Sequence, residues 1–547
     1  MKLLLKALLT LGLAAAGAVA RVDTLYSERL SKRSFDHNDN YNVTLLHVND
    51  VHAHLDQFSP DGTDCLDPSK GCVLGGYARI KHVVDTKRKE VPDALLLNAG
   101  DEFQGTLFYS YYKSEKIAET LNQLGFDAMA LGNHEFDDGN EEVVQFINKL
   151  NFPVTACNIR TNDTGLQQAL VPYVIFPEHK LAVVAVTTPS TADSSSPDAG
   201  TTFDHPISAI QNTVNVIQEV EDIKRIIALT HIGYAEDIEL AQKTRGIHMI
   251  IGGHSHTLLG DMPGAKGKYP TIQKNLDGEE VFIVTSYRWG EYIGSITITY
   301  DPSGRILSYA GEPIKLTDAI HQHVDLQDQI TKWRAPFEKF SREVVGRTEE
   351  TLSLDPCLTE ECTLGNLVSD AMLESCISHT PDLAGAILNG GGIRAGFGKG
   401  QINRGQILTA FPFGNALVEI NLTGRQLWDA VEGIVSGVNL KNGKKIPNFL
   451  QVSNEIRFSY NPGNSVGSRL VSLEFSGRRA EMERVYKIVT LDFLADGGDS
   501  YFEKQAGVIK HERIEDAIIR FIKAKSPLNI KIEGRSATTT ETRPRTG

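Results

Sequence analysis

The chain has 547 residues, more than one hydrophobic core usually supports, so we expect two domains of roughly 200–300 residues each. Its hydrophobic content of 41% is enough to fill such cores. Acidic residues number 69 and basic residues 55, which gives a net charge of −14. Because nucleic-acid polymers are bound by basic surfaces, this balance excludes them as the expected partner and leaves small anions.

Residues 1–20 have the pattern of a secretory signal peptide. Two lysines flank the start of the segment, an apolar run follows over residues 7–19, and the segment ends in the small-residue site Ala18-Val19-Ala20. We therefore expect the mature protein to be secreted and extracellular.

Two polar segments flank the expected domains. Residues 21–40 form an N-terminal segment in which Lys32-Arg33 is either a dibasic processing site or a solvated basic pair. Residues 536–547 form a polar tail without the apolar stretch that a lipid-anchor signal requires. We expect no membrane anchor on the mature chain.

Secretion exposes a chain to glycosylation and to disulfide formation. Three Asn-X-Thr sequons begin at Asn42, Asn162 and Asn421. The six cysteines comprise two closely spaced pairs and two isolated residues: Cys65 with Cys72, Cys357 with Cys362, and Cys157 and Cys376. We predict a disulfide in each close pair. The isolated cysteines lie in apolar contexts in different halves of the chain, which favours two buried thiols over a bridge.

Residues 41–317 alternate short apolar runs with amphipathic stretches. The runs are rich in β-branched residues and are followed by Gly, Asn, Asp or His, as is typical of the buried strands of an α/β domain. They cover residues 43–48, 94–98, 128–131, 181–186, 226–229 and 249–251. The loops after such strands carry polar side chains, and α/β folds place their chemistry there.

Residues 318–343 are predicted to form a helix that joins two domains. Apolar residues recur there at helical spacing, and only Pro336 interrupts the pattern. A second α/β segment follows over residues 344–535 and includes a glycine-rich loop over residues 389–400.

Five motifs place oxygen or imidazole ligands where an apolar run stops. They are Asp50-Val51-His52, Gly100-Asp101, Gly132-Asn133-His134-Glu135, Thr230-His231 and Gly252-Gly253-His254-Ser255-His256. A single histidine after a strand is more often a hydrogen-bonded residue than a ligand. Together, however, the motifs supply two carboxylates, one amide oxygen and four imidazoles besides His134, which is the set that two adjacent divalent ions need.

The motifs predict a dinuclear metal centre with one bridging carboxylate, which we assign to Asp101. The other ligands divide into two sets, with Asp50, His52 and His256 on one ion and Asn133, His231 and His254 on the other. Zinc suits this imidazole-rich set best, and manganese or cobalt also fits. Such ions acidify a bound water, polarise phosphoryl oxygens and orient an in-line attack on phosphorus.

His134 directly follows a predicted ligand, so its side chain should lie beside the ions. With Asp137 three residues further on, it can form a dyad whose protonated imidazole stabilises charge on the phosphoryl group or on the leaving oxygen. The alternative is that Asp137 caps a helix that begins near Asn140. The position of the pair inside the metal motifs favours the dyad.

The second half of the chain contains candidate residues for a nucleotide pocket. Three glycines at residues 390–392 allow the backbone to approach a ligand, and Arg394 can hold a phosphate. The alternative is a plain tight turn. Phe413 and Phe493 can offer flat faces to a purine, although an isolated phenylalanine is more often a core residue.

These motifs together resemble the metal-dependent 5'-nucleotidase family, which includes secreted ecto-5'-nucleotidases, apyrase-like enzymes and bacterial UDP-sugar hydrolases. The likeness spans nearly the whole mature chain. The metal motifs alone are shared with the wider metallophosphoesterase superfamily. The Asn-Gly-Gly-Gly-Ile-Arg motif at residues 389–394 and the Asp-Gly-Gly-Asp motif at residues 496–499 narrow the resemblance to the 5'-nucleotidases.

The resemblance implies a fold for both halves of the chain. Residues 41–317 would form a four-layer α/β/β/α metallophosphoesterase domain that carries the ions. Residues 318–343 would form the interdomain helix, and residues 344–535 would form the C-terminal α/β domain that binds the nucleotide.

The resemblance also implies roles in the nucleotide pocket. Phe413 and Phe493 would stack on the two faces of the base. Asn389 would contact the base edge and Asp499 the ribose hydroxyls. Arg394 would contact the phosphate.

One position departs from the family pattern. Ecto-5'-nucleotidases have an arginine directly after the first cysteine of the short cysteine loop, where this chain has Leu358. The loss of this cation should weaken phosphate binding or change the preferred number of phosphates.

We therefore predict a secreted metal-dependent 5'-nucleotidase that hydrolyses nucleoside 5'-monophosphates, AMP foremost, to nucleoside and phosphate. Its partners would be small-molecule nucleotides. Leu358 leaves open an apyrase or UDP-sugar hydrolase that cleaves ATP, ADP or UDP-glucose. An inactive nucleotide-binding scavenger is an alternative of another class, although all predicted ligands and His134 are present.

Overall fold

The computed structural model describes residues 20–21, 40–65 and 73–541. The chain divides into two compact units. The first comprises Met1–Phe58, Cys65–Gln104 and Phe108–Arg334, and the second comprises Ser59–Asp64, Gly105–Leu107 and Ala335–Gly547. The predicted signal peptide, apart from Ala20, and the Lys32-Arg33 pair lie outside the described residues.

The first unit contains two seven-stranded sheets. In spatial order, the first sheet consists of β1 (Ala20–Arg21), β7 (Tyr173–Phe176), β8 (Leu181–Thr187), β10 (Arg225–His231), β11 (Met249–Gly252), β13 (Glu280–Val284) and β12 (Thr271–Lys274). The second consists of β15 (Ile306–Gly311), β14 (Tyr292–Tyr300), β2 (Tyr41–Val48), β3 (Leu95–Asn98), β4 (Ala128–Ala130) and β5 (Val154–Thr155), with β16 (Ile314–Lys315) paired to β14. A separate pair is formed by β6 (Ile159–Arg160) and β9 (Thr202–Phe203).

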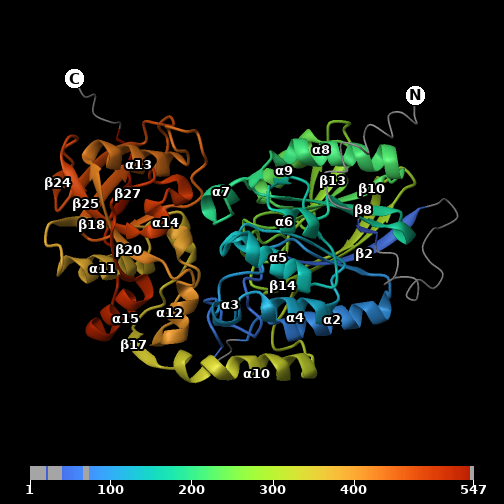
Figure 1. Cartoon of the computed structure of the whole chain (residues 1–547), viewed down its shortest axis with the longest axis horizontal. Coiled ribbons are helices and arrows are strands. Elements are labelled where there is room, and N and C mark those ends of the chain that lie inside the picture. Colours follow the sequence, from blue (N-terminus) through green and yellow to red (C-terminus); the bar gives the residue numbers. More distant parts are fainter. Residues whose placement is uncertain (1–19, 22–39, 66–72, 542–547) are drawn as a thin grey trace. The chain divides into compact units, whose positions relative to one another are not determined.

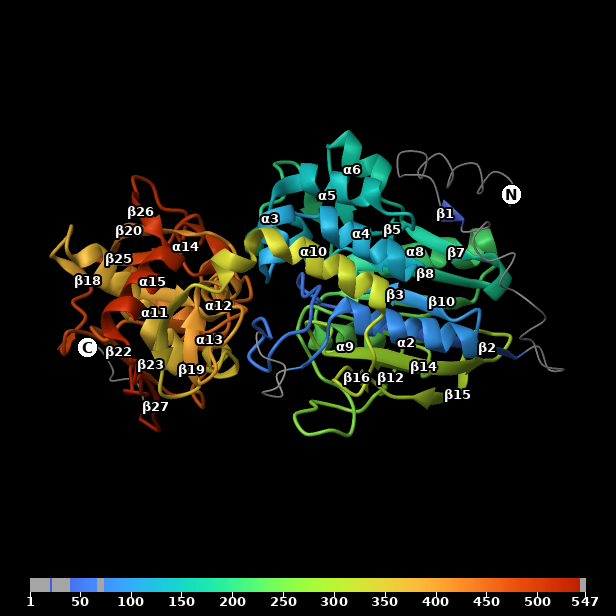
Figure 2. The same cartoon turned by 90° about the horizontal axis from the view of Figure 1, so that it is seen from below.

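The two sheets pack face to face around a shared hydrophobic core. Leu45 and Leu97 of the second sheet belong to the same buried cluster as Val183 and Leu229 of the first. Helices α8 (Pro206–Val216) and α9 (Tyr234–Lys243) pack on the other face of the first sheet. Helices α2 (Tyr77–Glu90) and α4 (Glu115–Leu124) lie along the outer face of the second sheet (Figure 1 and Figure 2). The layers of this unit are therefore α/β/β/α.

Each of the six apolar runs predicted as a strand forms one, in β2, β3, β4, β8, β10 and β11. The central strands β3, β8, β10 and β11 are buried along their whole length, which explains why their sequences are continuous rather than alternating apolar runs. Strands β2 to β5 pair in parallel, and so do β8, β10, β11 and β13. The carboxyl ends of neighbouring parallel strands consequently meet at one edge of each sheet.

Further helices occupy the connections between these strands. They are α3 (Leu107–Tyr112), α5 (Gly139–Lys149), α6 (Thr164–Ala169) and α7 (Thr191–Ser194). None of the helices in the described part of the chain has the length and apolarity needed to cross a membrane.

The helix predicted over residues 318–343 is α10 (Val324–Ser341). It begins later than predicted, because the residues before it form turns and the His323 N–H donates to the Ala78 carbonyl at 2.9 Å. Pro336 lies inside α10 without ending it. The division between the two compact units falls within this helix.

A five-stranded mixed sheet forms the centre of the second unit: β21 (Leu450–Val452), β18 (Leu383–Asn389), β25 (Val485–Leu491), β20 (Ala416–Thr423) and β26 (Ile509–Arg513). A four-stranded sheet consists of β24 (Arg478–Arg479), β23 (Leu470–Phe475), β22 (Ile456–Tyr460) and β27 (Ser536–Thr538), and β17 (Val344–Thr348) pairs with β19 (Gly400–Asn403). The helices are α11 (Thr363–Ile377), α12 (Arg404–Ala410), α13 (Gly424–Ser436), α14 (Asp492–Ala495) and α15 (Ile514–Lys525).

The cysteines agree with the predicted pattern wherever they are described. Cys357 and Cys362 form a disulfide, and Cys157 and Cys376 are buried free thiols. Cys65 is also disulfide-bonded, and its predicted partner, Cys72, lies outside the described residues.

The C-terminal segment differs from the polar tail predicted at residues 536–547. Its first residues form β27, which pairs in parallel with β22. Just before β27, the side chain of Arg535 is 2% exposed. Its guanidinium donates to both carboxylate oxygens of Asp370 at 2.7 Å and to the Val452 carbonyl at 2.9 Å. Arg535 therefore fixes this segment to the second unit.

We predict that Arg535→Met destabilises the second unit by about 2–3 kcal/mol, because Asp370 and the Val452 carbonyl lose their donor. Thermal unfolding and hydrogen exchange of the full chain measure the change. As a matched control, Arg520→Met removes an arginine whose side chain is 58% exposed and pairs with Glu512. The control should cost less than about 1 kcal/mol, and equal losses in the two variants would contradict the prediction.

Candidate active site

The predicted metal ligands lie at the carboxyl ends of five parallel strands. In chain order they are Asp50 and His52 after β2, Asp101 after β3, Asn133 after β4, His231 as the last residue of β10, and His254 and His256 after β11. Because β2, β3 and β4 belong to one sheet and β10 and β11 to the other, both sheets contribute to the site.

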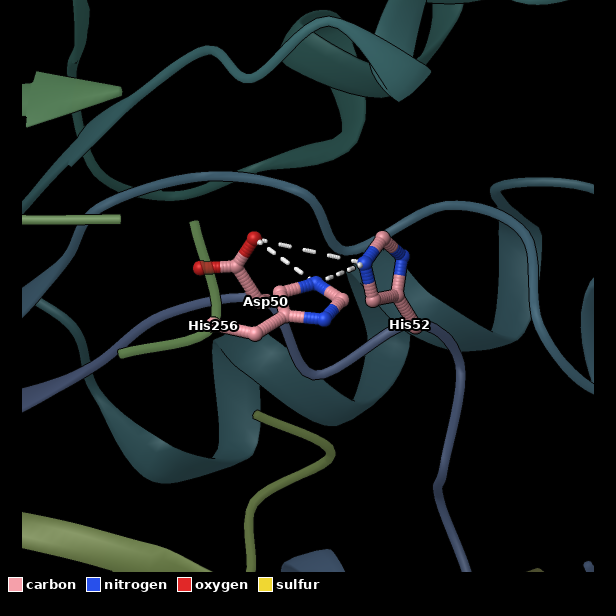
Figure 3. A group of neighbouring side chains, drawn as sticks. All are labelled: Asp50, His52 and His256. Carbon is pink, nitrogen blue, oxygen red and sulfur yellow. Dashed lines mark hydrogen bonds and ion pairs between the residues drawn. The ribbon is translucent and has the colours of Figure 1, made fainter. Parts of the chain in front are cut away.

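The first ligand group consists of Asp50, His52 and His256, whose side chains face one another (Figure 3). One potential ligand atom of each lies within 4.8 Å of those of the other two. His256 Nε2 is 3.3 Å from Asp50 Oδ1 and 3.1 Å from His52 Nε2. One carboxylate and two imidazoles that converge in this way can hold a divalent ion.

The second ligand group consists of Asp101, His231 and His254. His231 Nε2 is 3.0 Å from Asp101 Oδ2. The same carboxylate oxygen is 3.8 Å from His52 Nε2 in the first group. Asp101 therefore lies close to both groups, where a carboxylate that bridges two ions would be needed.

Asn133 allows a test of whether this site fits metal ions. Its side-chain oxygen is buried and accepts no hydrogen bond from any residue that the structure describes. A buried acceptor without a donor costs about 1–3 kcal/mol, and a bound cation would remove this cost. The carboxylate, imidazole and amide groups together fit two divalent ions.

The backbone of the ligand loops is strained. Five predicted ligands have left-handed conformations, with φ of 52° at Asp50, 50° at His52, 59° at Asp101, 77° at His254 and 49° at His256. Such conformations cost a non-glycine residue about 1–3 kcal/mol each and persist where neighbouring contacts enforce them. Here the Asp50 N–H donates to the Gly100 carbonyl at 2.9 Å, and the His52 N–H donates to the Asp101 carbonyl at 3.0 Å. The loops thus hold one another in place.

Backbone carbonyls orient two of the imidazoles. His52 Nδ1 donates to the Phe103 carbonyl at 3.0 Å, and His231 Nδ1 donates to the Ala99 carbonyl at 2.7 Å. These hydrogen bonds set the tautomer in which Nε2 of each ring could bind a cation.

Sequence reasoning assigned no role to Asn49 or Glu135, although both lie within or beside the ligand motifs. Asn49 Nδ2 donates to Asp50 Oδ2 at 2.7 Å. The buried Glu135 carboxylate accepts backbone N–H groups from two ligand loops, those of Asp101, Glu102, Phe103 and Gly132. Both are polar residues close to predicted ligands in the sequence without being predicted ligands themselves. This position in the sequence is the signal that could have identified them as supporting residues.

His134 and Asp137 are in contact. His134 Nδ1 is 2.7 Å from Asp137 Oδ2, and the His134 N–H donates to Asp101 Oδ1 at 2.9 Å. The His134 ring centre is 5.3 Å from that of His52. The alternative role for Asp137, as a helix cap, does not hold, because Asp138 is the N-cap residue of α5.

Charges within the site shift the pKa values of its histidines. Burial disfavours the charged form of His231, but Asp101 and Asp50 outweigh this effect and raise its pKa to about 10. Burial and the neighbouring charge of His231 lower the pKa of His254 to about 3. Without metal, His231 is therefore protonated at neutral pH and His254 is neutral.

We predict that metal binding releases a proton from His231, because only the deprotonated imidazole can bind a cation. Since its pKa is about 10 in the metal-free protein, affinity should rise by up to about tenfold for each pH unit between about pH 6 and pH 8. Isothermal titration of the metal-depleted protein, in buffers of different ionisation enthalpy, measures the proton count. Binding heats that are independent of the buffer would contradict the prediction.

In the second unit, four of the five predicted pocket residues contact one another in two pairs. Asn389 Nδ2 donates to Asp499 Oδ2 at 2.7 Å. The guanidinium carbon of Arg394 is 5.8 Å from the centre of the Phe413 ring. Phe493 packs on Gly498, where an added Cβ atom would lie 2.4 Å from the ring, and Gly498 precedes Asp499.

The amide of Asn389 is oriented by Asp499. Because the carboxylate accepts from Nδ2, the amide oxygen is directed elsewhere. This oxygen is buried and accepts no hydrogen bond within the described part of the chain. It is therefore an acceptor available to a donor group of a ligand.

Comparisons with known proteins cover both units. The sequence matches the family model "Calcineurin-like phosphoesterase" over residues 43–258 and the model "5'-nucleotidase, C-terminal domain" over residues 344–505. These matches agree with the predicted fold class, in which a metallophosphoesterase domain precedes a 5'-nucleotidase C-terminal domain.

Similar proteins cover most of the chain. A 5'-nucleotidase of Homo sapiens is 33% identical over 527 residues, which cover 90% of each chain. A snake venom 5'-nucleotidase of Naja atra is 34% identical over 493 residues, which cover 84% of this chain and 91% of that protein. The crystal structure of a 5'-nucleotidase precursor from Thermus thermophilus is similar with a TM-score of 0.84 and 30% identity, over 92% of this chain and 100% of the other.

Proposed function

The chain belongs to the 5'-nucleotidase family of metal-dependent phosphoric monoester hydrolases, and from this membership we propose that it hydrolyses nucleoside 5'-monophosphates, AMP foremost, to nucleoside and phosphate. The observation that carries the proposal is the convergence of two ligand groups from distant parts of the chain. The candidate pocket residues of the second unit, Asn389, Arg394, Phe413, Phe493 and Asp499, support the choice of substrate.

We propose that Asp50, His52 and His256 hold one divalent ion, and Asn133, His231 and His254 the other, with Asp101 shared between them. Two such ions supply an acidified water as nucleophile and polarise the phosphoryl oxygens. Zinc fits the donor set best, and manganese or cobalt also fits.

His134 is the proposed catalytic residue of the chain itself. Its Nδ1 bonds to Asp137, so Nε2 is the ring atom that can donate to a substrate. As an imidazolium, it would stabilise the negative charge that develops on the phosphoryl group or on the leaving 5'-oxygen. Asp137 would fix the orientation and tautomer of the ring.

The second unit would bind the nucleoside. Phe413 and Phe493 would stack on the base, and the free amide oxygen of Asn389 would accept a hydrogen bond from a donor on the base edge. Asp499 would accept from the ribose hydroxyls, and Arg394 would donate to phosphate.

We also propose that the protein is secreted after removal of residues 1–20. The 5'-nucleotidase of Naja atra, named as a venom protein, supports an extracellular role. Of the three sequons, Asn162 is the best candidate for glycosylation, because it is exposed in the segment between β6 and α6. Asn42 and Asn421 lie within strands.

We predict phosphate release from AMP by the protein loaded with zinc, manganese or cobalt. His134→Ala should lower kcat by about 10²–10⁴-fold, because it removes the group that stabilises developing charge. Phosphate release and product chromatography measure the rates. Absence of phosphate release from AMP with every metal would refute the proposal. A nucleotide-binding scavenger would be favoured if ATP, ADP and UDP-glucose were not cleaved either.

A second candidate function follows from Leu358, which occupies the position of a family arginine. An apyrase or UDP-sugar hydrolase would use the same ligand groups on the pyrophosphate bonds of ATP, ADP or UDP-glucose. Initial rates on these substrates and on AMP, compared under one set of conditions, distinguish the two functions. Faster turnover of ATP, ADP or UDP-glucose than of AMP would favour the second.

We predict that Leu358→Arg lowers the KM for AMP by about tenfold, because a guanidinium adds a charge-assisted hydrogen bond to phosphate. Leu358→Met, which keeps the apolar character and similar volume, is the matched control and should leave KM near the wild-type value. Steady-state kinetics of the two variants provides the measurement. Equal KM values for both would show that residue 358 does not contact the phosphate.

A further inference from the structure

We propose that Ser195 is a positioning residue for catalysis, which completes a Ser195–Asp137–His134 relay beside the ligand groups. This inference rests on the proposed function, because it assigns Ser195 a role through the His134–Asp137 dyad. Ser195 directly follows the short helix α7 and is 58 residues away from Asp137 in sequence.

The two oxygens of the Asp137 carboxylate have separate partners. Oδ2 accepts from His134 Nδ1 at 2.7 Å, and Oδ1 accepts from the Ser195 hydroxyl. A carboxylate held at one oxygen can rotate about its terminal torsion, whereas one held at both oxygens has a fixed plane. Ser195 thereby fixes the direction of the Asp137–His134 hydrogen bond.

The loop that carries Ser195 is tied to the segment that carries the dyad. The Ser196 N–H donates to the Phe136 carbonyl at 3.2 Å. Asn140 Nδ2 donates to the Thr201 hydroxyl at 2.9 Å, and the Asp198 N–H donates to Asn140 Oδ1 at 3.2 Å. These bonds hold the two segments side by side, so the Ser195 hydroxyl is not placed there by a single contact.

The same loop is also connected to a metal-ligand strand. The Thr188 N–H donates to the His231 carbonyl at 2.9 Å. The Thr191 hydroxyl donates to the Thr188 carbonyl at 2.7 Å, and the Ser195 N–H donates to the Thr191 carbonyl at 3.1 Å. A continuous set of hydrogen bonds therefore leads from the strand of His231 to the dyad, and the loop sets the position of His134 relative to that strand.

This geometry predicts an effect on turnover rather than on substrate binding. Ser195 bonds to the side of Asp137 that does not face His134, so it would act on the phosphoryl group only through the imidazole. Removing the hydroxyl would leave the dyad free to adopt unproductive orientations. Small misalignments of a catalytic group lower kcat, whereas KM depends on the nucleotide pocket.

The test uses four variants of the full chain, loaded with metal and assayed with AMP. Ser195→Ala should lower kcat by about tenfold, the effect of one lost hydrogen bond to a charged group, with KM unchanged. Ser195→Thr keeps a hydroxyl and should retain most of the activity, whereas Ser195→Val, which has nearly the same shape without the hydroxyl, should behave like Ser195→Ala. Ser196→Ala is the control, because the Ser196 hydroxyl makes no hydrogen bond to any residue that the structure describes.

A double-mutant cycle separates positioning from a general loss of structure. In an Asp137→Asn background, the additional Ser195→Ala substitution should lower kcat by less than about twofold, because Ser195 acts only through Asp137. The full tenfold loss in that background would overturn the proposal, as would wild-type kcat in Ser195→Ala or equal kcat in the Thr and Val variants.

The same variants also show whether a negative result concerns the role of Ser195 or the choice of AMP as substrate. If the wild-type protein does not hydrolyse AMP, the same variants are assayed with a phosphate monoester that it does hydrolyse, such as p-nitrophenyl phosphate. The relative kcat values of the variants then test the relay, whichever monoester is cleaved.

Discussion

The burial of two neighbouring carboxylates, Asp50 and Asp101, is the constraint on which the rest of the site depends. Burial alone would raise the pKa of both groups, but the surrounding histidines lower both values below the usual range. Two buried negative charges need positive charge close by. The protonated His231, or cations bound by the imidazoles, can supply it. The left-handed loops, the buried Glu135 and the amide of Asn49 are explained by the need to hold these groups at one point.

The close approach of the ligand loops leaves no space for a side chain at some positions. At Gly132, an added Cβ atom would lie 2.1 Å from Asp101 Oδ1. The Gly-Asn-His-Glu motif is thus explained residue by residue. The glycine leaves room for the carboxylate of Asp101. The asparagine has a buried side-chain oxygen that accepts no hydrogen bond from the described residues, the histidine contacts Asp137, and the glutamate accepts the backbone N–H groups of two loops.

Much of the first unit could be predicted from the sequence because its physical signals are local. Buried parallel strands are continuous apolar runs, and a ligand directly after each run places it at the carboxyl edge of the sheet. The His134–Asp137 contact could be predicted from a spacing of three residues. The contribution of Ser195 could not be predicted, because no pattern within a short segment links it to Asp137. The start of α10 was predicted too early. Apolar periodicity carries no information about the long-range hydrogen bond from the His323 N–H to the Ala78 carbonyl.

The division of the ligands between two sheets determines when a folding chain can bind metal. The first ligand group takes Asp50 and His52 from loops of one sheet and His256 from a loop of the other, and the second group likewise combines Asp101 with His231 and His254. Neither ligand group is complete on one sheet. A folding chain can therefore acquire tightly bound ions only after the two sheets have docked, so metal uptake marks the completion of this unit rather than its nucleation.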